Sequence, residues 1–103
     1  MEETIVSNNG VPIRLPEERW VHIVENHDDV AGHMDDVLDA VESPDLIIKG
    51  YGDALIALKK VKEDKFLAVV YKEIEPTDGF IITAYFSSKI KLDREVILWK
   101  RKQ

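Results

Sequence analysis

The sequence contains no cysteine, and it has no apolar run long enough to cross a bilayer as a helix. Without cysteine the chain forms no disulfide, no thiolate metal site and no cysteine nucleophile. The amino-terminal residues are acidic and polar, which is not typical of a secretory signal. These absences predict a cytoplasmic protein without a membrane segment, whose fold is held together by packing.

The chain does contain enough apolar sequence for one hydrophobic core. Its 103 residues are 45% hydrophobic and 33% charged, which is typical of one compact domain. No linker or internal repeat divides the sequence. We therefore expect residues 1–103 to form a single domain.

The charge is distributed unevenly along the chain, whose net charge is −6. Residues 1–45 carry twelve acidic side chains and two arginines, whereas residues 46–103 carry twelve basic and eight acidic side chains. A basic carboxyl-terminal half is compatible with an anion that docks there. It is equally compatible with two halves that attract each other without any ligand.

Two amphipathic helices are expected in the first half of the chain. Pro16, followed by two glutamates, favours a helix start, and this helix should extend to about His27. His22 falls on its polar side, opposite an apolar stripe of Trp20, Ile23, Val24 and His27. A second helix should end at Ser43, before Pro44, and its apolar residues at helical spacing are Met34, Val37, Leu38 and Val41.

Strand patterns follow the helices. The β-prone runs are residues 46–51, 54–61, 66–72, 80–88 and 96–99. Short connections between them favour an antiparallel meander. Before the helices, residues 4–7 and 11–15 flank Asn9 and Gly10, which predicts a hairpin with a two-residue turn, at an edge because Pro12 lacks a donor. We expect an α+β fold with both helices on one face of the sheet.

The run 80–88 shows the clearest alternation. Phe80, Ile82, Ala84 and Phe86 share one face, and Ile81, Thr83, Tyr85 and Ser87 share the other. The first face needs a core, and the hydroxyl groups on the second face predict a surface that is partly open to solvent or to a ligand.

Several short motifs occur in the same order as in one family: RLP at 14–16, RWVHI at 19–23, His27, VESPDLI at 41–47, LAVVYK at 67–72, ITAYF at 82–86 and LW at 98–99. The chain resembles the phage-associated branch of the barnase, EndoU, colicin and RelE (BECR) superfamily of metal-independent ribonucleases and toxins. The resemblance covers most of the sequence, and it rests on the order of the motifs.

The resemblance implies two amino-terminal helices packed on a four- to five-stranded antiparallel sheet, whose exposed face forms an RNA cleft. It implies functional roles for His22 and His27, for a basic residue of the central strands, and for Thr83 and Tyr85. Where the family often has an aromatic and basic pair, this chain has ALKK at 57–60. That departure leaves open which cation binds phosphate.

The chemistry of RNA cleavage without metal indicates the same residue types. It needs a base, an acid, and donors or cations around the phosphorane, and histidine fills either proton-transfer role near neutral pH. The catalytic candidates are His22, His27, Lys60, Thr83 and Tyr85. The candidates for substrate binding are Arg14, Lys59, Lys72, Ser87 and Lys89, and no cofactor is expected.

Three other interpretations remain open. His27 near a helix end is also typical of a histidine that only interacts with the last carbonyl groups. His22, His27 and His33 lie close in sequence, but their spacing is not one that chelates metal. A domain of the same fold could also bind RNA or a cognate protein regulator without cutting anything.

Overall fold

A β-hairpin precedes both helices in the computed structural model, which describes residues 2–102. The helices are α1 (Glu17–Asn26) and α2 (Met34–Glu42), with short 3-10 helices η1 (Asp28–Val30) and η2 (Leu92–Arg94). The strands are β1 (Glu3–Val6), β2 (Pro12–Leu15), β3 (Leu46–Lys49), β4 (Leu55–Lys62), β5 (Lys65–Glu75), β6 (Asp78–Ser87) and β7 (Ile97–Lys100). No helix within this part of the chain is long and apolar enough to cross a membrane.

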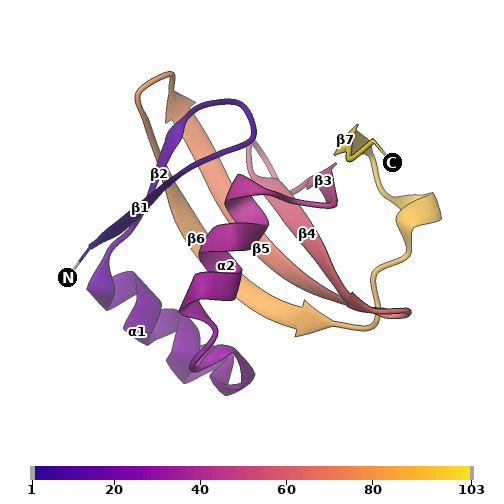
Figure 1. The fold of residues 1–103 in the computed structure, drawn as a ribbon, viewed down its shortest axis with the longest axis horizontal. Coiled ribbons are helices and arrows are strands. Elements are labelled where there is room, and N and C mark those ends of the chain that lie inside the picture. Colours follow the sequence, from indigo (N-terminus) through magenta and orange to yellow (C-terminus); the bar gives the residue numbers. More distant parts are fainter. Residues whose placement is uncertain (1, 103) are drawn as a thin grey trace.

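The strands of the described chain form one seven-stranded sheet in the order β1-β2-β6-β5-β4-β3-β7. Neighbouring strands pair antiparallel except β2 and β6, which run parallel. Both α-helices pack on one face of the sheet (Figure 1). The prediction of two amino-terminal helices on a four- to five-stranded antiparallel sheet is therefore wrong, because the helices lie between β2 and β3 and the sheet is larger and mixed.

The strand that makes the sheet mixed is β2. Ile13 and Leu15 are fully buried, while Arg14 between them is half-buried, so this short strand has one core face. It pairs with β6 through Ile13 opposite Gly79 and Arg14 opposite Phe80. The amino-terminal hairpin is thus an integral part of the sheet, since burial of its apolar face against the helices stabilises that position.

The hairpin turn is also longer than the predicted two-residue turn. Ser7 donates its N–H to the carbonyl of Val11 at 2.8 Å, and Gly10 donates to the carbonyl of Ser7 at 2.9 Å. Gly10 has a φ of 84°, and no residue type other than glycine has a positive φ in the described chain. This is a three-residue loop with glycine in the left-handed position, and Asn9 does not share that conformation.

The helix boundaries follow the expected signals. Pro16 precedes α1, whose first turn contains Glu17 and Glu18, and the N–H of His27 donates to Ile23 after the last turn. α2 ends before Ser43, whose carbonyl accepts a hydrogen bond of 2.6 Å from the Lys59 ammonium. A cation at this position satisfies a free helix carbonyl and complements the negative end of the helix dipole.

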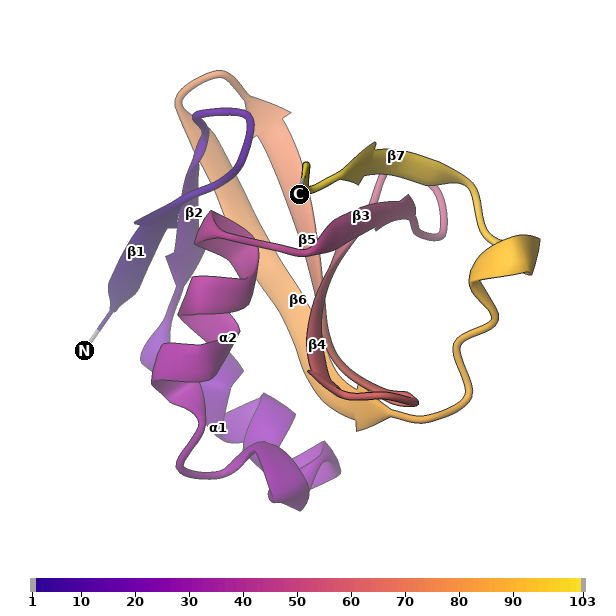
Figure 2. The same ribbon diagram turned by 45° about the vertical axis from the view of Figure 1, so that its right-hand side comes forward.

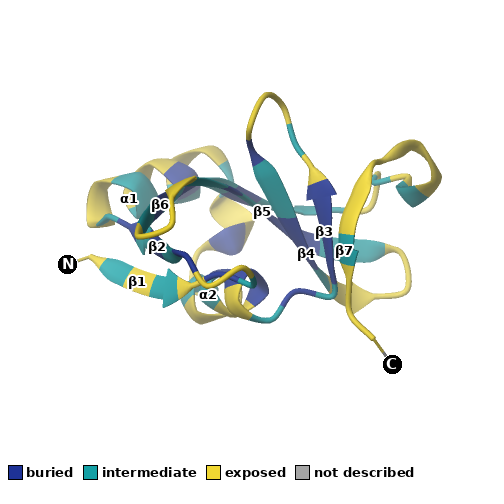
Figure 3. Ribbon diagram, turned by 90° about the horizontal axis from the view of Figure 1, so that it is seen from above, coloured by how far each residue is buried: buried dark blue, intermediate teal, exposed yellow. Residues whose placement is uncertain are grey.

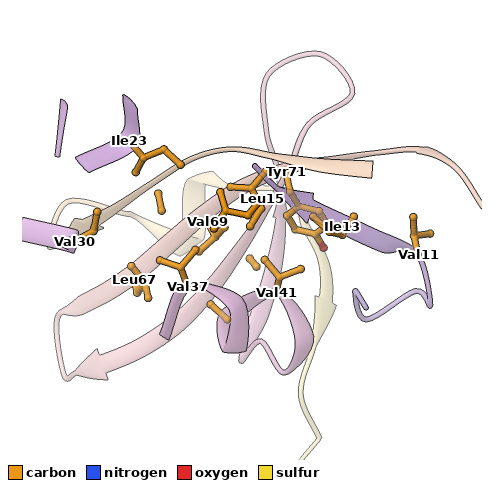
Figure 4. Close-up of a cluster of buried hydrophobic side chains, with 14 residues drawn as sticks. Val11, Ile13, Leu15, Ile23, Val30, Val37, Val41, Leu67, Val69 and Tyr71 are labelled. Atoms are coloured by element: carbon orange, nitrogen blue, oxygen red, sulfur yellow. The ribbon is translucent and has the colours of Figure 1, made fainter. Parts of the chain in front are cut away.

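Most of the core lies between the helices and the sheet (Figure 4). We call this cluster the helix-side core, and its buried members are Val11, Ile13, Leu15, Ile23, Val30, Val37, Ala40, Val41, Ala57, Leu67, Val69, Tyr71, Ile81 and Ala84. It joins β2 and the helices to the central strands, so the position of α1 on the sheet depends on it.

Tyr71 is the exception to the apolar character of this core. Its side chain is fully buried, and its hydroxyl has no hydrogen-bond partner among the described residues. Burial, and secondarily the charge of Glu73, raise the pKa of the phenol, so the group stays neutral.

We expect Tyr71→Phe to leave the free energy of unfolding unchanged or to raise it by up to about 1 kcal/mol. The substitution removes a desolvated hydroxyl that makes no hydrogen bond. Urea denaturation checks this, and a loss of more than about 1 kcal/mol would contradict it.

The expected alternation along β6 is interrupted. β6 has one more residue than β5 between the pairs Val70–Thr83 and Tyr71–Ile81, so Ile82 lacks a direct partner. Ile81 is therefore fully buried in the helix-side core, although simple alternation predicted it on the open face. Such an insertion shifts every residue on one side of it to the other face.

The sheet face away from the helices is partly covered as well. Phe66, Tyr85, Ile90 and Leu92 pack on a second cluster, the far-side core, whose buried members are Leu46, Ile48, Leu58 and Ala68. Ile90 and Leu92 come from the connection between β6 and β7, which passes this side of the sheet (Figure 2). Tyr85 therefore packs on this far-side core and is half-buried, which limits how much of this face a ligand can reach.

Candidate functional site

A cavity of about 360 Å³ lies where β2 ends, α1 begins and β6 passes beside them. We call it the Arg14–His22 cavity, and its lining consists of Arg14, Pro16, Glu18, Arg19, His22, Phe80 and Ile81. Two guanidinium groups, an imidazole, a carboxylate and an aromatic ring therefore surround one opening. This combination suits a ligand that has both a negative charge and a flat ring.

Arg14 is held in place by Asp78 at the start of β6. Its Nε donates to Oδ1 at 2.8 Å, and its Nη2 lies 3.4 Å from Oδ2. The hydrogen bond to Asp78, followed by the attraction between the two charges, raises the pKa of the guanidinium. Because Asp78 uses only part of the five N–H donors, Arg14 keeps donors for an anion in a fixed orientation.

Arg19 and His22 reach the cavity from α1. They are three residues apart, so their side chains lie on the same side of the helix. His22 is exposed, and the side-chain amide of Asn26 donates to its backbone carbonyl at 2.8 Å and lies 3.4 Å from its Nε2. No carboxylate lies within ion-pair distance of Arg19 in residues 2–102. Arg19 thus forms no ion pair within residues 2–102, although the carboxylate of Glu18 lines the same cavity.

The other two histidines contact aromatic residues further along β6. The ring centroid of His27 lies 5.6 Å from that of Tyr85, and the ring of His33 lies edge-on to Phe86 at 5.2 Å. Burial, and secondarily the charge of Glu95, raise the pKa of Tyr85, so its hydroxyl stays protonated. His27 and Tyr85 are adjacent, but neither lines the Arg14–His22 cavity.

Lys72 and Thr83 lie on strands next to the cavity. Arg14 and Lys72 are both opposite Phe80, one on β2 and the other on β5, so these three residues form a row across the sheet. Thr83 is opposite Val70, past the extra residue of β6. Lys72 therefore borders the cavity, whereas Thr83 lies beyond it towards Tyr85.

Four predicted site residues lie elsewhere. Lys59 is bound to the end of α2 and forms an ion pair with Asp39 there, at 3.3 Å. Lys60 lies 3.5 Å from Glu63 at the β4–β5 turn. Ser87 is opposite Phe66, and its Oγ accepts a hydrogen bond from the N–H of Lys89. The structure does not bring these side chains to the residues of the cavity.

Of the residues that line the cavity, the sequence interpretation selected only Arg14 and His22, and it missed Arg19 and Phe80 in particular. Arg19 could have been predicted, because its spacing from His22 places both residues on the same side of the helix. Phe80 was assigned to the core by strict alternation, and the extra residue in β6 prevented its recognition. No sequence pattern near Arg19 or Phe80 indicates that β2 lies beside β6.

A metal centre finds no support in the geometry. Among residues 2–102, no group of three or more histidine, aspartate or glutamate side chains is arranged to hold a metal ion. Nδ1 of His33 instead lies 2.9 Å from the carboxylate oxygen Oδ2 of Asp36.

Comparison with known proteins gives one partial likeness. The chain is 27% identical over 67 residues to the Trk system potassium uptake protein TrkA homolog of Methanothermobacter thermautotrophicus, a match that covers 65% of this chain and 31% of that protein. No family model matches the sequence. No solved structure matches it either. The chain thus spans about a third of the length of the relative that it resembles, and its family is not established by this likeness.

Proposed function

We propose that the chain binds single-stranded RNA at the Arg14–His22 cavity and cleaves it without a metal ion. The observation that carries this proposal is the convergence of Arg14, Arg19, His22 and Phe80 on one opening. RNA offers the matching groups, since a phosphate can bind the guanidiniums and an unpaired base can stack on an aromatic ring. A single strand is favoured because its bases are free to stack.

The proposed reaction is attack by the 2′-hydroxyl on the adjacent phosphorus. The bond from the 2′-oxygen to phosphorus forms, the bond to the 5′-oxygen breaks, and a 2′,3′-cyclic phosphate remains. His22 accepts the proton of the 2′-hydroxyl. Because His22 is exposed, water reaches the site, and the leaving 5′-oxygen takes a proton from that water. Arg19 and Arg14 donate hydrogen bonds to the phosphorane oxygens, which gain negative charge.

The proposed site keeps part of the set predicted from sequence. Arg14 and His22 act at the phosphate, and Lys72 borders it as a further contact to the strand. His27, Thr83 and Tyr85 flank the site along β6. Lys59, Lys60, Ser87 and Lys89 have no part in it, because they lie on other surfaces or bind other groups. We infer a cytoplasmic location, with which the absence of cysteine is compatible.

Incubation of the purified protein with a single-stranded oligoribonucleotide in EDTA tests the proposal. We expect cleavage with a 2′,3′-cyclic phosphate product, because the proposed reaction uses only the protein's own nitrogen donors. A matched oligonucleotide with a single 2′-deoxy sugar should resist cutting at that position only, since the nucleophile is missing. Intact RNA, or cleavage that EDTA abolishes, would contradict the proposed reaction.

A module that binds RNA or a protein partner without cutting is the second candidate. Two observations favour it: the net charge is −6, and the partial likeness is to a segment of a longer protein whose name refers to potassium uptake. RNA that binds but stays intact in the same assay would select this alternative.

A further inference from the structure

A second cavity, of about 290 Å³, lies at the end of the sheet where β3 pairs with β7. We call it the far-side cavity, and its lining consists of Asp45, Leu46, Lys60, Phe66, Leu92, Lys100 and Arg101. It shares no lining residue with the Arg14–His22 cavity. Figure 3 shows β7 as a largely exposed strand beside the buried strand β3 at this end of the molecule.

Part of the lining is apolar. Leu46 is a buried member of the far-side core, and Phe66 and Leu92 are half-buried and pack on that core. Leu46 and Phe66 come from β3 and β5, whereas Leu92 comes from the connection between β6 and β7. Side chains from three separate segments therefore offer an apolar ligand group contacts within one cavity.

The two lysines of the lining lie on the same face of the sheet as these apolar residues. Lys100 is directly opposite Leu46 in the pairing of β7 with β3, and Lys60 is directly opposite Phe66 in the pairing of β4 with β5. Side chains directly opposite each other in an antiparallel pair lie on the same face. The strand register thus places two ammonium groups beside an apolar surface.

The carboxylate of the lining is already bound within the chain. Asp45 accepts a hydrogen bond of 2.8 Å from the N–H of Lys60, and it lies 3.5 Å from Nε of Arg101. Arg101 also donates from Nη2 to the carbonyl of Ser43 at 2.7 Å. These contacts fix Arg101 and Asp45 in place, so Asp45 is not the group that receives a ligand.

Positive charge exceeds negative charge around the far-side cavity. Its lining contains three cationic side chains and one acidic side chain. Lys60 lies 3.5 Å from Glu63, which is outside the lining. Lys100 is exposed and has no carboxylate within ion-pair distance in residues 2–102. Lys100 is therefore the cation that is available to a ligand.

We propose that the far-side cavity binds a small carboxylate with an unbranched apolar chain. The carboxylate pairs with the ammonium of Lys100, and the chain lies against Leu46, Phe66 and Leu92. A volume of about 290 Å³ is at the lower end of the range for ligand pockets, about 300 to 1,000 Å³, so the ligand is small. This site does not depend on the proposed RNA cleavage, because the two cavities share no residue.

An adjoining cavity of about 810 Å³ indicates which way the ligand lies. It shares three lining residues with the far-side cavity, and it is also lined by one further lysine and by the carboxylates of Glu63, Asp64 and Asp93. An anion meets more like charge there than beside Lys100. The carboxylate of the ligand therefore lies at the Lys100 end, and its chain points towards the adjoining cavity.

Titration of the nitrogen-15-labelled chain with octanoate, followed by amide chemical shifts, tests the proposal. We expect saturation with a dissociation constant of about 1 mM or below, a modest affinity for so small a ligand, and the largest shifts at Leu46, Phe66 and Lys100. Butyrate should bind at least about tenfold more weakly, because it keeps the carboxylate but buries less apolar surface. Octylammonium has the same chain with the opposite charge and should leave these amides unshifted at about 5 mM.

Lys100→Gln tests the role of the unpaired ammonium group. This variant should bind octanoate at least about fivefold more weakly than the wild type, because a charge-assisted hydrogen bond is lost. The matched control is Lys49→Gln, which removes the same charge from β3 outside the lining of the far-side cavity and should bind like the wild type. Both lysines are exposed, so both variants should keep the wild-type circular dichroism spectrum.

Three results would overturn the proposal. The first is the absence of saturable shifts with octanoate at up to about 5 mM. The second is equal binding of octylammonium, which would mean adsorption of any apolar chain, or equal binding of butyrate, which would mean attraction of any small anion. The third is equal affinity of Lys100→Gln and Lys49→Gln for octanoate.

Discussion

Replacing His22 with glutamine is expected to lower the rate of RNA cleavage at least about a hundredfold. His22 is the one histidine, of the three in the described chain, that lines the Arg14–His22 cavity. A positioned group that transfers a proton contributes about 10² to 10⁴ in rate, and glutamine fills similar space but does not titrate. Since the side chain is exposed, the variant should unfold at the wild-type temperature.

The control for this variant is His33→Gln. His33 pairs with Asp36 and contacts Phe86, away from the Arg14–His22 cavity. The His33→Gln variant should cleave RNA within about twofold of the wild-type rate, because no proton transfer in the proposed reaction depends on His33. His27→Gln, measured in the same assay, shows whether His22 or His27 transfers the proton. Equal losses in His22→Gln and His33→Gln, or none in His22→Gln, would show that His22 is not the proton acceptor.

Elements that depend on local sequence could be predicted. Pro16 and the two glutamates after it place the start of α1, and Ser43 followed by Pro44 ends α2, as the structure confirms. The meander from β3 to β6 also follows from its short connections. In each case, residues close in sequence determine the local structure.

The pairing of β2 with β6 could not be predicted in this way. Ile13 and Gly79 are partners although more than sixty residues separate them, and no turn signal connects two parallel strands. The hairpin was therefore predicted at an edge without a known neighbour, and the sheet was predicted too small. The Arg14–His22 cavity depends on this pairing, so its composition was missed together with the topology.

One error in the predicted site was avoidable. Lys59 and Lys60 are consecutive residues of a strand, and their side chains must point to opposite faces. The structure shows Lys59 at the end of α2, on the helix side, and Lys60 beside Glu63. A single phosphate site could not use both, and the alternation along β4 was sufficient to show this.

Gly79→Ala is expected to lower the free energy of unfolding by about 3 kcal/mol or more. Gly79 is buried in β6 at the point where β2 pairs with it. A Cβ atom there would overlap the carbonyl oxygen of Lys72 and lie 2.6 Å from Cδ1 of Ile13. The oxygen belongs to the β5 backbone and Ile13 is fully buried, so neither can move without disturbing the sheet.

Gly32→Ala is the matched control, since it separates lack of space from backbone conformation. Gly32 has a φ of 81°, and a Cβ atom added to it would have no neighbour within 4 Å, so alanine there costs only the left-handed conformation, about 1 to 2 kcal/mol. Gly79 is not among the residues with positive φ in the described chain, so its cost arises from crowding. Urea denaturation should therefore rank Gly79→Ala well below Gly32→Ala in stability. Hydrogen exchange should also show that the Ile13 amide is less protected in Gly79→Ala, because the parallel pairing is lost first. Equal stabilities of the two variants, or unchanged protection of the Ile13 amide, would mean that β2 is not fixed to β6 at this glycine.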